Sequence, residues 1–544
     1  MRNRWWCTGP PIIVGAAALA AVFALAASGS PNSRNGVTKT LSLAVAGTDV
    51  DYTDPALAYA VPSWQIEYET CSTLVGYSDV GGASSELSPD AATGFPVISN
   101  HGKTYTFTIR RGIRFDDGAP VTPESFAAAF NRDANPAMES PVDAFMGDVV
   151  GYDNVVDKKA STVSGVVAKG DTLTIKLTTA DGGLLDKLAM PFFCAIEPSK
   201  TPVDPNGVDT LPGSGPYYIA DRTIGKEIVL KTNPYYTGNR PHRSDTIVMT
   251  MNTDPQQTFL QVSNGTYAAD PEHLDEPAAA GALEKKYGLN KSRFFVHASP
   301  ETDYLALNTQ SPIFGSAAMR KAVNYAIDRP ALLRVRGVLG GTRTTTILPR
   351  SLTGGVYDQR LYPIAGAEPA KAKSLARGAC GNVNLWYSAN PAETPQAGIV
   401  QYDLAQMGCK VTAKPFVGYA LFSAAGVKGA DFDLMFAGWY QDYADGYDFF
   451  HILLDGRTIQ NANNDDLAYF NQPTVNAKID AANKLTGTAR AKAWGSLDIY
   501  TMKNYAPWAP IDNENIRDFI GPHTAGYQFS PAWGSMDLGT LYLK

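Results

Sequence analysis

One stretch of twenty residues, 431–450 (DFDLMFAGWYQDYADGYDFF), restricts the fold of this chain more than any other. Phe432, Leu434 and Phe436 alternate along it as the buried residues of a β-strand do. The turn that follows, residues 439–443, presents flat aromatic side chains around one carboxylate, and such a surface rarely faces plain water. We interpret the stretch as the floor of a ligand cleft that other parts of the chain fold to cover.

Length and charge narrow the class of protein. With 544 residues, 44% of them hydrophobic, the chain can bury a large core, and two or three lobes are expected. The net charge of −7 comes from interspersed charges of both signs, so we expect no nucleic acid and no anionic membrane surface as a partner. The 49 glycines, 36 prolines and 27 tyrosines suit a secreted binding protein or an extracellular hydrolase.

The N-terminus predicts export. Arg2 and Arg4 precede an apolar run at residues 12–27, and residues 24–26 (ALA) form a cleavage site, so we expect residues 1–27 to be a signal peptide. The sixteen apolar residues fall short of the roughly 20 that span a bilayer, and no later stretch is longer, so a soluble mature chain is expected. An uncleaved N-terminal anchor remains the alternative.

A lipid anchor is not expected. Residues 25–28 (LAAS) resemble the bacterial lipoprotein box, but Ser28 stands where the lipid-bearing cysteine belongs, and a serine cannot form the thioether. Cys7 lies on the other side of the apolar run and cannot replace it. Residues 28–38, rich in Ser, Asn and Gly, then read as a flexible linker.

Four cysteines remain after the signal, an even number that is typical of an oxidising compartment. Cys380 and Cys409 each precede a predicted strand, residues 383–387 and 410–415, and a predicted helix at 396–407 separates the two. Such a β-α-β unit brings the two strand starts side by side, so we predict a disulfide between this pair.

Cys71 and Cys194 are the remaining two cysteines. By elimination we pair them as a second disulfide. The alternative, two small buried thiols with no bond between them, stays open.

The rest of the chain alternates predicted strands and helices. Thr122 and Pro123 are typical of an N-cap and the first position of a helix. A helix at 317–327 carries Arg320 on its expected exposed side, and the pattern changes near Ser299, where we place a lobe boundary. Further strands are predicted at 41–46, 103–109, 172–177, 227–231, 246–251 and 304–308, and further helices at 66–74, 126–130, 184–193 and 492–503.

Two loops invite a functional interpretation. The polar loop at residues 47–55 follows the first strand, where loops often line sites, so Asp54 is a candidate ligand-binding residue. Residues 213–218 (GSGPYY) are similar to a phosphate loop only superficially, because no Lys-Ser/Thr follows them. We expect that corner to be a turn into a strand.

Five blocks of the chain, in order, resemble the bacterial ABC-transporter extracellular solute-binding proteins of family 5, the oligopeptide, dipeptide and nickel class. The blocks are 103–130 (KTYTFTIRRGIRFDDGAPVTPESFAAAF), 213–218 (GSGPYY), 233–238 (NPYYTG), 307–329 (LNTQSPIFGSAAMRKAVNYAIDR) and 431–450. The resemblance implies a periplasmic-binding-protein-like (type II) Venus flytrap with two α/β lobes and an extra N-terminal subdomain. It also implies a solute-binding component that closes on a ligand and delivers it to a membrane permease.

The resemblance further implies lobes that are discontinuous in sequence. We expect lobe I with the extra subdomain (about 76–205) at 39–298, lobe II at 299–510, and a return to lobe I at 511–544. The expected partners are a peptide or other small solute and an ABC permease, and we expect a monomer without a cofactor.

In peptide-binding relatives an aspartate a few residues after a Gly-Trp pair holds the peptide's α-ammonium, and Asp442 occupies that place here. Removing one partner of such a buried pair costs on the order of 3 to 5 kcal/mol, which selects for a free amine. The alternative is that Asp442 only caps a turn. Trp439 and Tyr443 are candidates for stacking on a ligand side chain or a sugar ring, or they are core aromatics.

The chain departs from the family pattern in two places. Gly446 follows Asp445 where relatives usually have proline. Between Arg377 and Asp431 there is no arginine to clamp a ligand carboxylate, which argues against strict dipeptide specificity and favours longer peptides or another ligand. Arg343 is a candidate substitute clamp, although a solvated loop arginine is the default interpretation.

Catalysis and metal binding are not expected. The chain has no G-x-S-x-G or H-E-x-x-H motif, and its six histidines lie far apart in sequence. Asp442, Asp445 and Asp448 have the wrong spacing for a calcium loop, and Leu453 stands in the place of its bidentate glutamate. The acidic cluster around His273 is expected to be a solvated loop.

Three alternatives to a peptide-binding protein stay open. They are a binder of oligosaccharide or another small solute, a secreted hydrolase whose triad assembles from distant residues, and a structural or sensory wall protein.

Overall fold

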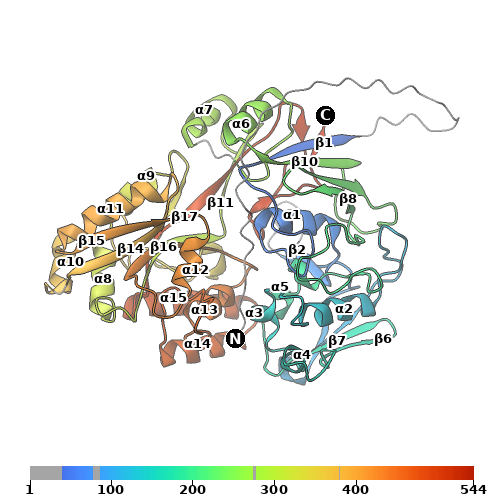
Figure 1. The fold of residues 1–544 in the computed structure, drawn as a ribbon, viewed down its shortest axis with the longest axis horizontal. Helices are drawn as coiled ribbons and strands as arrows, with labels where there is room; N and C mark the ends of the chain where they lie inside the picture. Colours follow the sequence, from blue (N-terminus) through green and yellow to red (C-terminus); the bar gives the residue numbers. More distant parts are fainter. Residues whose placement is uncertain (1–38, 78–85, 274–276, 379) are drawn as a thin grey trace.

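The computed structural model describes residues 39–77, 86–273, 277–378 and 380–544. The expected signal peptide and linker, and the question of lipidation, lie outside these residues. Two α/β halves sit side by side, with a further subdomain below the first (Figure 1). We call the half around β1 lobe I and the half around β16 lobe II. No helix in the described ranges has the length and apolar character needed to cross a bilayer.

The sheet of lobe I runs in the order β1-β10-β9-β8, with β1 parallel to β10 and the other pairs antiparallel. Leu41 and Leu43 bury one face of β1, and Met536 and Leu541 from the C-terminal segment belong to the same core cluster. The end of the chain therefore packs on its beginning. The elements are β1 (Thr40–Ala46), β8 (Tyr217–Thr223), β9 (Glu227–Thr232), β10 (Thr246–Thr253), α1 (Val61–Thr70), α6 (Pro255–Asn264), α7 (Pro277–Tyr287), β18 (Thr524–Ala525), β19 (Phe529–Ser530), β20 (Ser535–Met536) and β21 (Tyr542–Leu543).

The subdomain is built on an antiparallel sheet, β4-β5-β7-β6, with a separate two-stranded pair, β2-β3. Its longest helix, α2, begins at Pro123 as predicted, and the Thr122 backbone N–H donates to Ser125 Oγ at 3.2 Å, which helps to hold the first turn. The elements are β2 (Val75–Tyr77), β3 (Leu87–Pro89), β4 (Val97–Ser99), η1 (Asn100–Gly102), β5 (Thr104–Thr108), α2 (Pro123–Asp133), α3 (Asp143–Met146), α4 (Tyr152–Val156), β6 (Val166–Lys169), β7 (Thr172–Lys176), α5 (Leu184–Lys187) and η2 (Pro191–Phe193).

Lobe II surrounds a larger sheet in the order β11-β17-β12-β16-β14-β15, with β13 also paired to β17. The predicted β-α-β unit is confirmed, because β14 and β15 pair in parallel and α11 connects them. The strands are β11 (Phe294–Ala298), β12 (Glu301–Leu307), β13 (Gly341–Arg343), β14 (Asn382–Ser388), β15 (Lys410–Phe416), β16 (Leu434–Tyr440) and β17 (Trp508–Phe519). The helices are α8 (Ala317–Ala326), α9 (Arg329–Arg334), η3 (Arg350–Leu352), α10 (Pro369–Ala376), α11 (Glu393–Gln406), α12 (Ala420–Ala425), α13 (Gly446–Leu454), α14 (Pro473–Asn483) and α15 (Gly487–Asn504).

Strand β17 connects the two lobes. Its first half pairs with β12, and Ala509 and Ile511 lie in the lobe II core. Its second half pairs with β11, and Phe519 packs against Val262 and Leu283 of α6 and α7. One twelve-residue strand therefore reaches from the core of lobe II to the cluster under α6 and α7 of lobe I, which makes it a physical link between the lobes (Figure 1).

Both predicted disulfides are present. Cys380 and Cys409, at the starts of β14 and β15, have Cα atoms 4.8 Å apart, and Cys71 and Cys194 have Cα atoms 5.7 Å apart. The second bond joins the end of α1 to the segment after η2, so it ties lobe I to its subdomain.

The helix predicted at 66–74 is shifted. Helix α1 ends at Thr70, because Gly215 donates its N–H to the Thr70 carbonyl and Ser72 donates its N–H to Ser214 Oγ. A Cβ on Gly215 would lie 2.4 Å from the Glu69 carbonyl oxygen, so the glycine-rich corner is built for this close approach.

Two other predictions are corrected by packing. The helix expected at 184–193 breaks into the single turn α5 and the 3₁₀ turn η2, because Pro191 has no N–H to continue the hydrogen bonding. Arg320 is 3% exposed rather than solvated, and it donates to the carbonyls of Phe314 and Tyr505.

Candidate functional site

A cavity of about 730 Å³ lies between the lobes, within the size range of small-molecule and peptide sites. One wall comes from the loop before α1, from α3 and from the turn between β7 and α5. The other comes from β16, α13, the segment after α13, and α14. The cavity therefore opens between surfaces that are hundreds of residues apart in sequence.

The stretch that opened our sequence interpretation forms part of this second wall. Strand β16 is central in its sheet and pairs with β12 and β14, so its end is held firmly. Residues 441–445 then turn into α13, whose N-cap is Asp445, with Oδ1 accepting the Tyr447 N–H. Trp439 and Tyr447 line the cavity on either side of this turn.

Asp442 lies directly behind the cavity wall and is 8% exposed. The hydroxyl of Tyr59, a lobe I residue that lines the cavity, donates to Asp442 Oδ2 at 2.9 Å. Desolvation by burial is the main cause that raises the pKa of Asp442, with a further contribution from the negative charge of Asp465, and the hydrogen bond from Tyr59 opposes the shift, so the net pKa is about 7.

Asp448, on the first turn of α13, is completely buried and joins Asp442. Its Oδ2 accepts the Asp442 backbone N–H and the Trp439 indole N–H, each at 3.0 Å. Burial, followed by the charge of Asp442, raises the pKa of Asp448 well above its ordinary value.

Neither carboxyl group has a cationic partner among the described residues. The charged groups that influence Asp442 and Asp448 are other carboxyls, and the remaining contacts are with Tyr59 and Trp439. A buried carboxylate without a counterion is costly, so this pair is an unusual arrangement for a resting protein.

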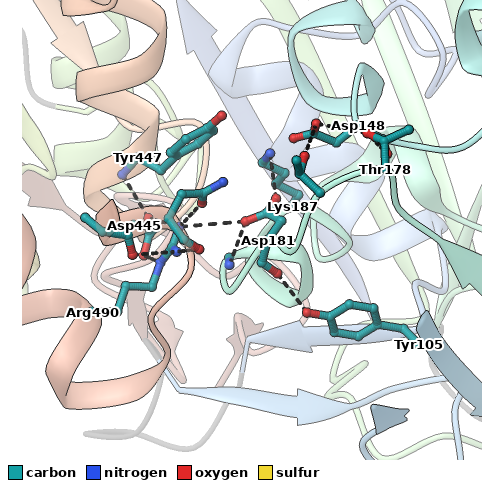
Figure 2. Close-up of polar contacts among 12 residues, drawn as sticks. Tyr105, Asp148, Thr178, Asp181, Lys187, Asp445, Tyr447 and Arg490 are labelled. Carbon is teal, nitrogen blue, oxygen red and sulfur yellow. Dashed lines mark hydrogen bonds and ion pairs between the residues drawn. The ribbon is translucent and has the colours of Figure 1, made fainter. Parts of the chain in front are cut away.

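Asp445, three residues from Asp442, has the opposite environment (Figure 2). Arg490 of α15 donates to both of its oxygens, at 2.7 and 2.8 Å. The same guanidinium lies 3.8 Å from Asp181, which forms an ion pair with Lys187 at 2.8 Å. All four side chains are buried.

This four-membered cluster joins the lobes, because Asp181 and Lys187 belong to the subdomain and Asp445 and Arg490 belong to lobe II (Figure 2). Beside it, the Gly182 N–H donates to the Asn483 carbonyl at 2.9 Å. Burial raises the pKa of Asp181, but Lys187 and Arg490 outweigh burial, so the net pKa is lowered. We call Asp181, Lys187, Asp445 and Arg490 the interlobe charge cluster.

Most cations of the cavity wall are already paired. Arg457 contacts Asp455 and Asp480 at 2.6 and 2.7 Å, and His451 contacts Asp455 at 3.2 Å. Among the described lining residues, Lys484 has no carboxylate partner. The lining carboxylates are Asp143, Asp148, Asp465 and Asp480. The wall therefore offers little positive charge to a ligand anion.

Three other residues singled out from the sequence, Tyr443, Asp54 and Arg343, are not among the residues that line the cavity. Tyr443 is 1% exposed and packs edge-on against Phe145 as a core aromatic, whereas Trp439 lines the cavity. The Asp54 carboxylate is fully buried and accepts two hydrogen bonds from Arg132 at 2.6 Å, so it presents no oxygen to the cavity. Arg343 lies on β13, which pairs with β17, outside the cavity wall.

A separate acidic cluster lies where β12 meets β17. Oxygen atoms of Glu301, Asp303 and Glu514 come within 4.8 Å of one another. Arg336 forms ion pairs with Asp303 and with Glu514, so a guanidinium already occupies the position of a cation there. We therefore assign this cluster to the junction of the lobes and not to a metal ion.

Sequence reasoning missed several residues of the site. Tyr59 lies four residues beyond the loop at 47–55 that was predicted to line a site, and no motif marks it. Asp448 was weighed only as a calcium ligand. Lys187 and Arg490 belong to no motif: Lys187 pairs with Asp181 six residues before it, and Arg490 pairs with Asp445, which is 45 residues away in sequence.

Comparison with known proteins agrees with this architecture. Residues 86–461 match the model of bacterial extracellular solute-binding proteins, family 5 Middle. Heme-binding protein A of Haemophilus influenzae is 24% identical over 82% of this chain and 83% of its own length. A probable D,D-dipeptide-binding periplasmic protein of Escherichia coli is 25% identical over 78% of this chain and 79% of its own.

Solved structures show the same fold. The clavulanic acid biosynthesis oligopeptide binding protein 2 superposes with a TM-score of 0.84 and 25% identity, covering 93% of this chain and 96% of that protein. Haemophilus influenzae OppA in complex with the peptide RPPGFSPFR superposes with a TM-score of 0.73 and 20% identity over 93% and 99% of the two chains. With its type II binding-protein fold and a family match over most of its length, the chain belongs to the bacterial extracellular solute-binding proteins of family 5.

Proposed function

We propose that this chain is the extracytoplasmic solute-binding component of an ABC importer and that it captures peptides by their free N-terminal amine. The observation that carries the proposal is Asp442, a buried carboxyl group at the cavity wall with no cation among its described neighbours. A ligand ammonium supplies the missing charge, and the low-dielectric surroundings make that ion pair selective against neutral ligands.

The charges on the rest of the cavity wall favour peptides longer than dipeptides as ligands. Among the described lining residues the arginine, Arg457, is held by Asp455 and Asp480 and is therefore not available for a ligand carboxylate. Lys484, an exposed side chain, is the cation left at the rim of the described wall. A peptide is thus held firmly at its amino end, while Trp439 offers an aromatic face to the side chains that follow.

We propose binding without turnover, by a monomer that passes its ligand to a membrane permease. Contacts across the cavity, such as that of Tyr59 with Asp442, tie lobe closure to the ligand site. The two disulfides suit an oxidising, extracytoplasmic compartment. Asp54 and Arg343 stay outside the proposed site.

The test is a binding panel read by thermal unfolding and calorimetry. Alanine peptides of two to six residues are compared with their N-acetylated forms, and a ligand at 100 times its Kd stabilises the folded protein by about 2.7 kcal/mol. Asp442→Asn is expected to weaken binding of free-amine peptides by more than about tenfold and to spare N-acetylated ones. Asp143→Asn, which removes a carboxylate from the opposite wall, is the matched control and should change the affinities for free-amine and N-acetylated peptides only slightly.

Other outcomes separate the alternatives. Equal losses for free and acetylated peptides would remove the ammonium role from Asp442. Stabilisation by an oligosaccharide or by hemin, with none by any peptide, would replace the peptide by another solute. Consumption of any compound in the panel would identify an enzyme.

A further inference from the structure

The Asp442–Asp448 pair has a property that ligand capture alone does not require: it holds two carboxyl groups in one buried site with no cation from the described residues. The Asp442 backbone N–H donates to Asp448 Oδ2 at 3.0 Å, so the two side chains lie close together, and Asp448 is completely buried. Like charges this close in a dry site without a counterion strongly favour a state in which one of the two carboxyl groups carries a proton. The pair therefore stores at least one proton when the cavity is empty.

The contacts of Asp448 identify it as the group that keeps its proton. Its Oδ2 accepts two N–H bonds, from Trp439 and from the Asp442 backbone. Its Oδ1 is buried and receives no N–H or hydroxyl donor from any described residue, as expected of the oxygen that bears the hydrogen. A proton on that oxygen leaves Asp448 as a neutral acid beside Asp442.

Asp442 is the group that exchanges its proton. It is the more exposed of the two, 8% against 0%, and Tyr59, which lines the cavity, supplies a hydrogen bond that supports its ionised form. The charged and titratable groups that face the pair among the described residues are Tyr59 from lobe I, Tyr443 from the turn itself and Asp465 from the segment after α13. The lining cations Lys187 and Arg457 are paired with other aspartates and do not neutralise it.

We propose that ligand capture is a proton-for-ammonium exchange: binding of the peptide's ammonium breaks the O–H bond of Asp442 and releases that proton to solvent, while Asp448 keeps its own proton and donates a hydrogen bond to the new carboxylate. The electron pair of the broken bond stays on the Asp442 oxygen and faces the ammonium. The exchange rests on the proposed function, because it needs an amine ligand.

The exchange makes affinity depend on pH with a definite sign. Below the pKa of Asp442, about 7, each ligand must displace a proton, so affinity falls by up to about tenfold for each unit of pH. Above that pKa the carboxyl group is already ionised. The peptide's α-amine, with a pKa near 8, then loses its own charge, so affinity falls again on the alkaline side.

Calorimetry with tetra-alanine tests the exchange directly. Titrations at pH 6 and pH 8 in buffers of different ionisation enthalpy count the protons that move on binding. We expect release of about 0.9 proton at pH 6 and net uptake of about 0.4 proton at pH 8, from Asp442 and the peptide amine respectively. Peptide binding with no proton release at pH 6 would overturn the exchange and leave the proposed function intact.

Two variants test the role of Asp448 as a positioning residue. Asp448→Asn replaces the acid by a neutral donor of the same shape, so it should keep tetra-alanine affinity within about threefold and preserve proton release at pH 6. Asp448→Leu removes the donor and should weaken binding by about tenfold or more and shift the acid limb of the pH profile to higher pH. An equal loss of tetra-alanine affinity in both variants would overturn the positioning role of Asp448.

The empty protein provides a readout that needs no ligand. Infrared spectroscopy with 13C-labelled aspartate, compared between the wild type, Asp442→Asn and Asp448→Asn, reports whether each carboxyl group is protonated. We expect both to be protonated at pH 6 and only Asp448 at pH 8. Two ionised groups at pH 6 would overturn the inference. Failure of every amine ligand to bind, at any pH, would overturn the proposed function and the exchange together.

Discussion

Asp445 and the Asp442–Asp448 pair lie within seven residues of one another, are similarly buried, and have opposite electrostatics. Asp445 is held by Arg490 in the interlobe charge cluster (Figure 2), whereas the pair has no cation among the described residues. Burial is therefore not what distinguishes them. The paired aspartate joins the two lobes, and we propose that the unpaired ones keep a place for a positive charge that arrives with the ligand.

The two parts of the interlobe charge cluster are each neutral without the other. Asp181 pairs with Lys187 within the subdomain, and Asp445 pairs with Arg490 within lobe II. Separation of the lobes thus leaves no isolated buried charge on either side. This arrangement suits a contact that must form and break in every transport cycle, since opening costs only the weaker attraction between two neutral pairs.

The largest expected effect comes from removing the cation of the cluster. Arg490→Met leaves Asp445 buried without a counterion and should lower the free energy of unfolding by about 3 to 5 kcal/mol, measured by urea denaturation at pH 7. Arg111→Met is the control, because its ion pair with Asp171 is exposed and should contribute little. Similar losses in the two variants would contradict the special role of the buried pair.

The second prediction is an increase in the free energy of unfolding, opposite in sign to the effect of Arg490→Met. The pKa of Asp442 is about 7 in the folded protein and about 3.9 when unfolded, so between these values the native state binds more protons. Stability contributed by this group therefore falls as pH rises from 4 to 7. In the empty protein, Asp442→Asn should raise the free energy of unfolding at pH 8 by about 2 to 4 kcal/mol and change it little at pH 4.

Asp445→Asn is the matched control for that experiment, since the same chemical change three residues away removes the partner of Arg490. It should lower stability at pH 8. If both aspartate variants shifted stability in the same direction, the contrast between the two environments would fail.

The smallest expected effect tests the lobe contact without changing charge. A Cβ on Gly182 would lie 1.9 Å from the Leu485 carbonyl oxygen, so Gly182→Ala pushes the subdomain away from lobe II. By lowering the closed population it should raise the Kd for tetra-alanine about fivefold to tenfold and increase the radius of gyration measured by X-ray scattering. Gly94→Ala, where a Cβ meets nothing within 4 Å, should leave both unchanged.

Local patterns predicted much of the fold. The strand at 103–109, the helix start at Thr122 and Pro123, and the β-α-β unit that aligns Cys380 with Cys409 all follow from spacing of apolar residues and from capping chemistry. Predictions failed where distant segments intervene. The end of α1 at Thr70 is set by residues 214–215, and Arg320 is buried because carbonyls from the ends of α8 and α15 surround it.

The sequence by itself determined the class of the protein and its most informative carboxylate, because the strand-turn pattern around Trp439 and Asp442 is contained in one short segment. Only the tertiary structure decided what each aspartate of that segment does. A carboxyl group's role depends on which polar and charged groups lie within a few ångströms of it. Asp445 meets Arg490 of α15, 45 residues away in sequence, and Asp442 meets Tyr59 of the other lobe, so only the folded chain brings these groups together.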